Sequence, residues 1–196
     1  TKSDLILRDL DILAPMAAKG LASVAVSVTT LDRGLARRLE PRAPTAAKRL
    51  RAIAGLAGAG VPVTVLAAPM IPALNDMELD AIIAEAAAAG ATAAGYVLLR
   101  LPGEVAGLFR EWLDTHYPDR AERVLNRLKA SREGALYRAD WGARHTGTGI
   151  EAQLLAARFK AALKRAGLDR ARSGSRPMRT DLFRPPVPPS AQMSLF

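Results

Sequence analysis

Three strand-like stretches, each followed by a helix-like stretch, constrain the fold of this chain more than any other feature of its sequence. Strands are expected at 21–30, 61–68 and 94–101, and the segments between them carry apolar residues every three or four positions. The strand starts lie about 30 to 40 residues apart, a spacing typical of βαβ units in a parallel sheet. The sequence therefore predicts an α/β fold whose ligands bind where the carboxyl ends of the strands meet.

The first expected strand has two different faces. Val24, Val26 and Val28 point to one side and suit a face that helices cover. Ser23, Ala25, Ser27 and Thr29 point to the other side, where small and polar side chains leave room for a ligand. Three strand–helix units are too few to close a barrel, so an open strand edge is expected where the chain begins.

Residue usage excludes several classes of protein. The chain has no cysteine, which excludes disulfides and thiolate metal sites within these residues. Its two histidines leave little for a histidine-based metal site. Its apolar run at 61–74 is interrupted by Pro62, Pro69 and Pro72, so no membrane span is expected. The first residue is Thr1 and no signal-like segment precedes it. We therefore expect a cytoplasmic chain that starts inside a longer protein.

Positive charge is concentrated in the second half of the chain. The formal net charge is +9, and residues 110–196 carry 17 Lys and Arg against 9 Asp and Glu. Residues 1–109 are nearly balanced, with 11 against 10. A basic surface suits a polyanion, because Lys and Arg neutralise phosphates and release their counterions. A solvated, arginine-rich surface without such a partner explains the same counts, and the sequence leaves both interpretations open.

The patterns divide the chain into three parts. These are the strand–helix units at 1–117, a helix–hairpin–helix extension at 118–168 and a disordered, basic, Pro-rich tail at 169–196 that ends in QMSLF. Within the extension, residues 136–150 predict a hairpin or an exposed loop. Earlier in the chain, Asn75 with Glu78 three residues later predicts a capping box at the start of a helix.

Several short motifs follow one another in a recognisable order. Val26-Ser27-Val28 is followed, thirteen residues after Ser27, by Glu40-Pro41, and Ala59-Gly60 precedes a strand that ends in Ala68-Pro69-Met70-Ile71. Further on, Tyr137-Arg138-Ala139-Asp140-Trp141-Gly142 is followed by Gly147-Thr148-Gly149. This order resembles the spore-photoproduct-lyase-like branch of the radical SAM superfamily over about residues 1–168, with Thr1-Lys2 at the end of its third strand.

The resemblance implies the C-terminal part of a partial (βα)6 radical SAM barrel. Such an enzyme binds a 4Fe–4S cluster and S-adenosylmethionine, and it cleaves S-adenosylmethionine to a 5′-deoxyadenosyl radical that abstracts hydrogen from a substrate. The cluster motif, CxxxCxxC, follows the first strand in this superfamily, so its ligands are expected outside this chain. The fragment alone is then expected to be inactive, and DNA, as in a repair reaction, is a substrate that suits the basic second half.

The resemblance also implies residues that contact the cofactor. Ser27 matches the polar residue of the fourth strand that contacts S-adenosylmethionine, and Lys2 matches a lysine at a strand end near the same ligand. Glu40 would bind the ammonium of the methionyl group and Arg42 its carboxylate, although a surface ion pair explains each equally well. Three further residues are candidates to pack on the adenine, with core packing as the alternative: Ile71, Tyr96 and Leu98.

One departure from the family concerns the reaction. Spore photoproduct lyases carry a hydrogen-donating cysteine two residues before the serine, and this chain has Ala25 there. The hairpin is also longer than in those lyases. A lyase-like enzyme of a related branch is therefore the better assignment. An aldolase-like barrel with a Schiff-base lysine is disfavoured, because none of the three expected strands carries a lysine.

Four residues are expected to contact the substrate. Arg100 lies at the end of the last expected strand, and Trp141, Arg144 and His145 lie in the expected hairpin. The planar donors of arginine and the stacking surface of tryptophan suit a phosphate and an unstacked base. In the alternative, Trp141 anchors the hairpin and Arg144 is solvated.

The last five residues suggest a partner. Gln192, Met193, Leu195 and Phe196 resemble, with the small Ser194 between them, the peptide by which bacterial DNA repair and replication proteins bind the sliding clamp. Leu195 and Phe196 would fill an apolar pocket, and a Pro-rich arm would reduce the ordering cost of binding. This motif also supports a second hypothesis, a non-catalytic adaptor that associates with DNA and the clamp and derives from a decayed half-barrel.

Overall fold

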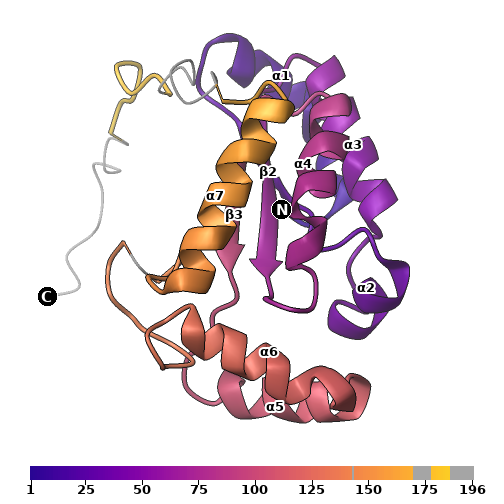
Figure 1. Cartoon of the computed structure of the whole chain (residues 1–196). Coiled ribbons are helices and arrows are strands. Elements are labelled where there is room, and N and C mark those ends of the chain that lie inside the picture. The colour runs from indigo at the N-terminus through magenta and orange to yellow at the C-terminus, as the bar shows by residue number, and fades with distance from the viewer. Residues whose placement is uncertain (143, 170–177, 186–196) are drawn as a thin grey trace, which may run out of the picture.

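The computed structural model in Figure 1 describes residues 1–142, 144–169 and 178–185. Its centre is a parallel sheet of β1 (Val24–Ser27), β2 (Val63–Met70) and β3 (Ala93–Leu98), in that spatial order. The strand β1 is shorter at both ends than the sequence pattern predicts, β2 is displaced by two residues, and β3 ends three residues earlier, but all three overlap the expected ranges. The predicted α/β class with a parallel sheet is confirmed.

Helices make up most of the remaining described chain. They are η1 (Asp4–Asp9), α1 (Leu10–Ala18), α2 (Arg33–Leu39), α3 (Ala46–Gly58), η2 (Asp76–Glu78), α4 (Leu79–Ala88), α5 (Val105–His116), α6 (Pro118–Ala130) and α7 (Ile150–Arg165). Among the described residues, none of these helices combines the length and the apolar character that crossing a membrane requires. Helix α2 was not predicted, because it has seven residues of which only Leu35 is buried. Its start is fixed by Asp32, whose carboxylate accepts from the Leu35 backbone N–H at 2.6 Å.

The sheet has one face that helices cover. Helix α3 packs on β1 and β2, α4 packs on β2, and α7 packs on β3 and on α4, as the parallel helices in Figure 1 show. The strand residues on this face are fully or almost fully buried: Val24, Val26, Val63, Val65 and Ala67. Burial of such aliphatic side chains contributes about 1.5–3 kcal/mol each to folding, so this layer holds the sheet together.

The side chains on the opposite face of the sheet differ in size and polarity from those on the helix-covered face. It carries the side chains, or the bare backbone, of five residues that the structure leaves only half-buried: Ala25, Ser27, Thr64, Leu66 and Gly95. We call this set the open face. The sequence predicted a small, polar face opposite the valines of the first strand, and the structure confirms it. A sheet that helices cover on one face only is compatible with part of a barrel.

In the described part of the chain, no other strand borders the outer edge of β1, which is hydrogen-bonded to the first residue of the chain. The backbone nitrogen of Thr1 donates to Ala25 O at 2.8 Å, and Ser27 N donates to Thr1 O at 2.9 Å. These are the hydrogen bonds of a parallel neighbour, so Thr1 lies where the next strand of the sheet would run. Thr1 and Lys2 were expected to form the end of a strand; Thr1 has the hydrogen bonds of such a position, but neither residue belongs to a strand of the sheet.

Helices α5 and α6 form a separate pair beyond the carboxyl ends of the strands, in the lower part of Figure 1. They enclose a second core with residues of the loops that follow β2 and β3. Its most buried members are Ile71, Leu101, Leu113, Val124, Leu125 and Leu128. Because this core lies beyond the strand ends, it extends the protein on the side where a parallel sheet binds ligands.

Two local predictions need correction. No strand forms in the described part of 136–150, which is a loop of turns, so the hairpin alternative fails and the exposed-loop alternative holds. The capping box is absent, because Asn75 and Glu78 bind backbone groups at the end of β1 instead of the start of a helix.

Part of the expected tail lies against the body of the protein. In the segment 178–185, Arg179 N donates to Gly20 O at 2.9 Å, and the side chain of Arg179 forms an ion pair with Asp181. The segments 170–177 and 186–196 are outside the described residues. The expected clamp-binding residues Gln192, Met193, Leu195 and Phe196 belong to the second of them.

Candidate ligand-binding site at the carboxyl ends of the strands

Glu40 is the centre of a polar group at the carboxyl end of β1. Its carboxylate forms ion pairs with Lys2 and, at 2.6 Å, with Arg49, and it accepts a hydrogen bond from Thr29 Oγ1 at 3.0 Å. The Arg49 guanidinium also donates to Ser27 O at 3.0 Å. Two residues that the sequence pattern assigned to the cofactor, Lys2 and Glu40, are therefore in contact, and Arg49 connects them to the strand that carries Ser27.

The charge of Glu40 is fixed by its two cationic partners. Burial on its own would raise the pKa of this carboxyl, but the hydrogen bonds and charges of Lys2 and Arg49 outweigh burial and hold the pKa below its usual value of 4.5. Glu40 is thus ionised at neutral pH and already neutralised. Because Lys2 is the more exposed of the two partners, it is the one that an incoming ligand can displace.

A cavity of about 520 Å³ lies next to this group, between α2 and the start of α3. Its wall is rich in charged side chains, which include Asp32, Arg33, Arg37, Glu40 and Glu85. The volume falls within the range of about 300–1,000 Å³ that is usual for small-molecule sites. Ligand-sized space and fixed charge therefore occur together at the end of β1.

The other residues assigned to the cofactor lie elsewhere. Arg42 is exposed and has no ion pair within the described ranges. Ile71 and Leu98 have 0% exposed surface, each inside one of the two cores. Tyr96 packs on Phe159 of α7, with ring centroids 4.9 Å apart, and burial raises its pKa. Tyr96 and Leu98 therefore pack in the core on the helix-covered side, and Ile71 packs in the second core, which was the alternative interpretation of all three.

A second polar group lies at the carboxyl end of β3. One terminal nitrogen of Arg100 donates to Tyr137 Oη at 3.1 Å, and the other lies 3.4 Å from His145 Nε2. The guanidinium carbon of Arg144 lies 4.1 Å from the centroid of the Trp141 ring, which is 87% exposed. The structure thus brings together all four residues that the sequence assigned to the substrate. Trp141 does not anchor the loop, because almost all of its surface faces solvent.

Arg132, which follows α6, connects this group to the sheet. It is 1% exposed, and its guanidinium donates to Leu99 O at 2.7 Å and, more weakly, to Leu98 O and Arg144 O at 3.4 Å. Burial and the neighbouring charge of Arg100 lower the pKa of Arg132. Carbonyl groups at the end of β3 would otherwise lack partners, so Arg132 satisfies them and fixes the loop that carries Arg144.

The same loop is held against the end of α6 by its glycines. Thr148 N and Gly149 N both donate to Ser131 O, at 3.0 and 3.2 Å, and a Cβ atom at position 149 would overlap Ala130 O. Gly147 has φ +76°, in the region that favours glycine. His145 O accepts from Leu98 N at 2.7 Å, which places His145 beside β3. Close backbone packing therefore sets the position of the substrate residues.

The electrostatic environment of His145 is strongly positive. Desolvation and, in decreasing order, the charges of Arg144, Arg100 and Arg132 lower the pKa of His145 below its ordinary value of 6.5. The imidazole is thus mainly neutral at pH 7, and it gains a proton more easily when an anion offsets the three guanidinium charges.

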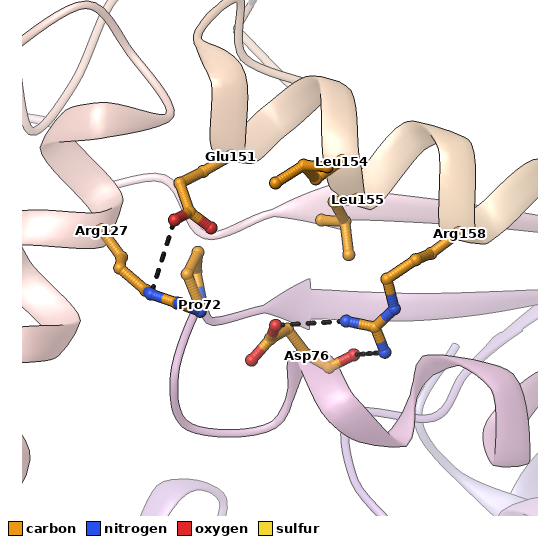
Figure 2. A pocket seen from close by; sticks show the side chains of 7 residues that line it. All are labelled: Pro72, Asp76, Arg127, Glu151, Leu154, Leu155 and Arg158. Carbon is orange, nitrogen blue, oxygen red and sulfur yellow. Dashed lines mark hydrogen bonds and ion pairs between the residues drawn. The ribbon is translucent and has the colours of Figure 1, made fainter.

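Another hollow, of about 190 Å³, lies between α6, α7 and the loop after β2 (Figure 2). Its charges are paired: Arg127 lies 3.5 Å from Glu151, and Arg158 lies 3.3 Å from Asp76 and donates to its backbone oxygen at 2.9 Å. These pairs fasten α7 to the rest of the protein. Because each charge in Figure 2 has its partner, we assign this hollow a structural role.

Arg49 and Arg132 were not predicted from the sequence, although a signal for both is present. Arg49 continues the buried stripe of α3 that contains Ile53 and Leu56, and Arg132 continues the stripe of α6 that contains Leu125 and Leu128. An arginine in the register of an apolar stripe is expected to be buried, and a buried arginine needs designated partners. Among the residues with described positions, no cluster of His, Asp or Glu could hold a metal ion.

Comparisons with known proteins give relatives without an assigned activity. No protein-family model matches the chain, and no solved structure matches it significantly. An uncharacterized protein of Mycobacterium tuberculosis is 38% identical over 125 residues, which cover 63% of this chain and 37% of that protein. An uncharacterized protein of Methanocaldococcus jannaschii is 28% identical over 132 residues, which cover 67% of this chain and 48% of that protein. The chain therefore spans less than half the length of these curated relatives.

Proposed function

We propose that this chain is the C-terminal part of a partial radical SAM barrel, and that the whole protein is a lyase-like enzyme that binds a 4Fe–4S cluster and S-adenosylmethionine. The observation that supports this most is the open face. A parallel sheet that is covered by helices on one face, and that carries small side chains beside the larger Leu66 on the other, suits half of a ligand-binding barrel. The residues that hold the cluster then lie outside this chain, which has no cysteine.

The residues of the open face fit an S-adenosyl ligand in size and in polarity. Ala25 has a small side chain on this face, where an adenine can lie beside the strand, whereas the side chain of Leu66 lies over Gly95. The Ser27 hydroxyl can donate to a ribose oxygen and accept from a ribose hydroxyl. Ser27 is also tied by its backbone oxygen to Arg49, which keeps the strand end in place.

Lys2 and Glu40 would bind the methionyl end of the same ligand. Glu40 is ionised and carries a displaceable partner, so its carboxylate can accept from an ammonium group while Lys2 turns to the ligand's carboxylate. Arg49 stays in place during this exchange, because it is buried and keeps its bonds to Ser27 O and Pro44 O. When bound, the cluster and S-adenosylmethionine supply a carbon radical, and the protein orients the ligand and excludes water.

The test is anaerobic reconstitution of the full-length protein with iron and sulfide. We expect a brown protein with about one cluster per chain, which releases 5′-deoxyadenosine from S-adenosylmethionine under reduction. Ser27→Ile should abolish this release and leave the cluster content unchanged, because it fills the open face. Ser23→Ile, at an exposed position outside the strand, is the matched control. A colourless protein without any release of 5′-deoxyadenosine would reject the enzyme and favour the adaptor hypothesis.

We further propose DNA as the substrate and the sliding clamp as a partner. The basic group at the end of β3 supports the first proposal, and the sequence of residues 192–196 supports the second. A peptide that covers residues 185–196 should bind the clamp with a Kd in the micromolar range, about −8 kcal/mol. Replacing Leu195 and Phe196 by alanine should weaken binding of the peptide to the clamp by more than about 2 kcal/mol. Absence of binding by the native peptide at a clamp concentration of about 100 µM, far above that Kd, would reject the partner.

A further inference from the structure

Three arginines and a histidine at the end of β3 form a cationic group without a counter-charge. Among the described residues, neither Arg100, Arg132 nor Arg144 forms an ion pair with a carboxylate. Six other arginines of the second half each form one: Arg110, Arg127, Arg138, Arg158, Arg165 and Arg179. The segments outside the described ranges contain no Asp or Glu in their sequence. Some exposed arginines, such as Arg42, also have no ion pair within the described ranges, but Arg132 is only 1% exposed and lies beside a second unpaired arginine, Arg100.

Such an arrangement is unfavourable unless something offsets it. Burial of a guanidinium without a counter-charge costs several kcal/mol, and like charges nearby add to that cost. Carbonyl oxygens compensate part of it at Arg132, but the Nε atoms of Arg132 and Arg100 are both buried and have no hydrogen-bond partner in the described structure. Buried N–H donors without acceptors are rare in folded proteins. A bound anion would neutralise the charge, although the two buried Nε atoms themselves are out of its reach.

We propose that Arg100, Arg132, Arg144 and His145 form a binding site for a phosphate oxyanion. The guanidinium fork matches the geometry of phosphate oxygens, and Tyr137 Oη, which accepts from Arg100 at 3.1 Å, fixes the direction in which that fork points. Arg132 is a positioning residue here, because its hydrogen bonds hold the backbone of Arg144. The site deepens the proposal that DNA is the substrate, on which its assignment to nucleic acid rests, and it does not depend on the radical chemistry.

The neighbouring tryptophan indicates the source of the phosphate. Trp141 is 87% exposed and its ring lies under the Arg144 guanidinium, so a base adjacent to a bound phosphate can stack on the free side of the ring. A single-stranded nucleic acid would contact the arginines with a phosphodiester and the Trp141 ring with a base. A small phosphate ester uses only the arginines and His145, and this difference separates the two sources by experiment.

The experiment measures binding of two probes to the full-length protein without cluster or S-adenosylmethionine. The probes are inorganic phosphate, followed by calorimetry, and a fluorescent oligothymidylate, followed by anisotropy. We expect both to bind, and we expect Arg100→Gln and Arg144→Gln each to weaken both by about tenfold. The matched control is Arg138→Gln, whose guanidinium is already paired with Glu133 and Asp140, and it should change either affinity by less than about twofold.

A further variant decides between the two sources. Trp141→Ala should weaken the oligonucleotide by about fivefold or more and leave inorganic phosphate unchanged if nucleic acid is the ligand. Equal binding of the oligonucleotide by Trp141→Ala and the parent assigns the site to a small phosphate ester. The proposal is overturned if the parent protein binds neither probe, or if Arg100→Gln and Arg144→Gln bind like Arg138→Gln. Failure of the radical reaction would leave these affinities unaffected, so the two proposals fail separately.

Discussion

The side-chain amide of Asn75 donates to the backbone oxygen of Thr29 at 2.8 Å, across 46 residues of sequence. The same amide donates to Pro69 O at 3.0 Å and its oxygen accepts from Ile71 N at 2.6 Å. One buried side chain thus joins the end of β1 to the loop that follows β2. The carboxyl ends of the two strands, which border the proposed cofactor site, are held together by this residue.

Replacing Asn75 should destabilise the protein more than a surface substitution does. Asn75→Ala leaves two carbonyl oxygens and one N–H buried without partners, and we expect the free energy of unfolding to fall by about 3 kcal/mol. The matched control is Asn126→Ala on the exposed side of α6, which should change it by less than about 0.5 kcal/mol. Urea unfolding followed by circular dichroism measures both. Equal midpoints for the two variants would show that Asn75 does not hold the strand ends.

Two glycines should respond to alanine in opposite directions. Gly149→Ala places a methyl group against Ala130 O and should lower the free energy of unfolding by about 2 kcal/mol or more. Gly107→Ala, in α5, meets open space and should raise it by about 0.5–1 kcal/mol, because alanine loses less entropy in a helix. Thermal unfolding of the two variants beside the parent tests the pair. A neutral Gly149→Ala would contradict the close packing of the loop on α6.

The ion pairs of Glu40 should make stability depend on pH in the acidic range. The folded-state pKa of Glu40 is lower than its ordinary value of 4.5, so its contribution is fully present above that pH. It is lost as the pH falls through the lower folded-state pKa. At pH 7, Glu40→Gln should cost about 2–3 kcal/mol, because Arg49 is then buried without a counter-charge.

The comparison of Glu40→Gln with the parent gives the test. The difference in free energy of unfolding should stay constant from about pH 7 to about pH 5 and narrow below about pH 4, where the parent also becomes neutral at this position. Glu111→Gln, at an exposed position of α5, is the control and should show no such narrowing. A difference that is independent of pH would mean that Glu40 contributes hydrogen bonds and no charge.

Binding of an anion at the end of β3 should strengthen as the pH falls. His145 faces Arg100, Arg132, Arg144 and Tyr137, and its pKa lies below 6.5 in the free protein. A bound phosphodiester offsets the arginine charges and raises this pKa, so oligothymidylate should bind several-fold more tightly at about pH 5.5 than at about pH 7.5. Thymine and the phosphodiester do not titrate in this interval, so the change belongs to the protein.

The two histidines of the chain provide the control for this measurement. His145→Gln should remove most of the pH dependence and leave the affinity at about pH 7.5 almost unchanged, because the imidazole is neutral there. His116→Gln, which affects an exposed residue at the end of α5, should keep the dependence of the parent. A parent affinity that is flat over this range would show that His145 does not face the bound anion.

The sequence predicts what depends on local periodicity. Alternation of Val24, Val26 and Val28 with smaller residues locates β1 and distinguishes the two faces of the sheet. Asn75 and Glu78 were misinterpreted because their spacing matches a local motif, whereas their partners lie 46 to 48 residues away. A rule based on the spacing of neighbouring residues cannot take account of a hydrogen-bond partner that only folding brings close.

For the residues of the site, too, local sequence patterns could be interpreted, whereas partners that are distant in sequence could not. Arg100, Trp141, Arg144 and His145 were predicted from their positions at strand and loop ends, and the structure gathers them. Arg132 was not predicted, because its partners are backbone carbonyls of Leu98 and Leu99, which no residue type reveals. Tyr96 and Leu98 were candidates for the adenine only through the family resemblance, with core packing as the alternative, and α7 covers their side of β3.

The position of α5 and α6 between β3 and its covering helix α7 has a consequence for how such proteins diversify. The helical pair is an insertion within a single strand–helix unit, and it buries its own core apart from the strands. Its length and surface can therefore change over evolution while the register of β1, β2 and β3 stays the same. Arg132 follows directly after this insertion. A different insertion would therefore change the orientation of the loop that carries Arg144 and leave the open face unchanged. The proposed anion site and the proposed cofactor site are therefore separable in this architecture, and laboratory grafting of foreign helical pairs at 105–130 can exploit that separation.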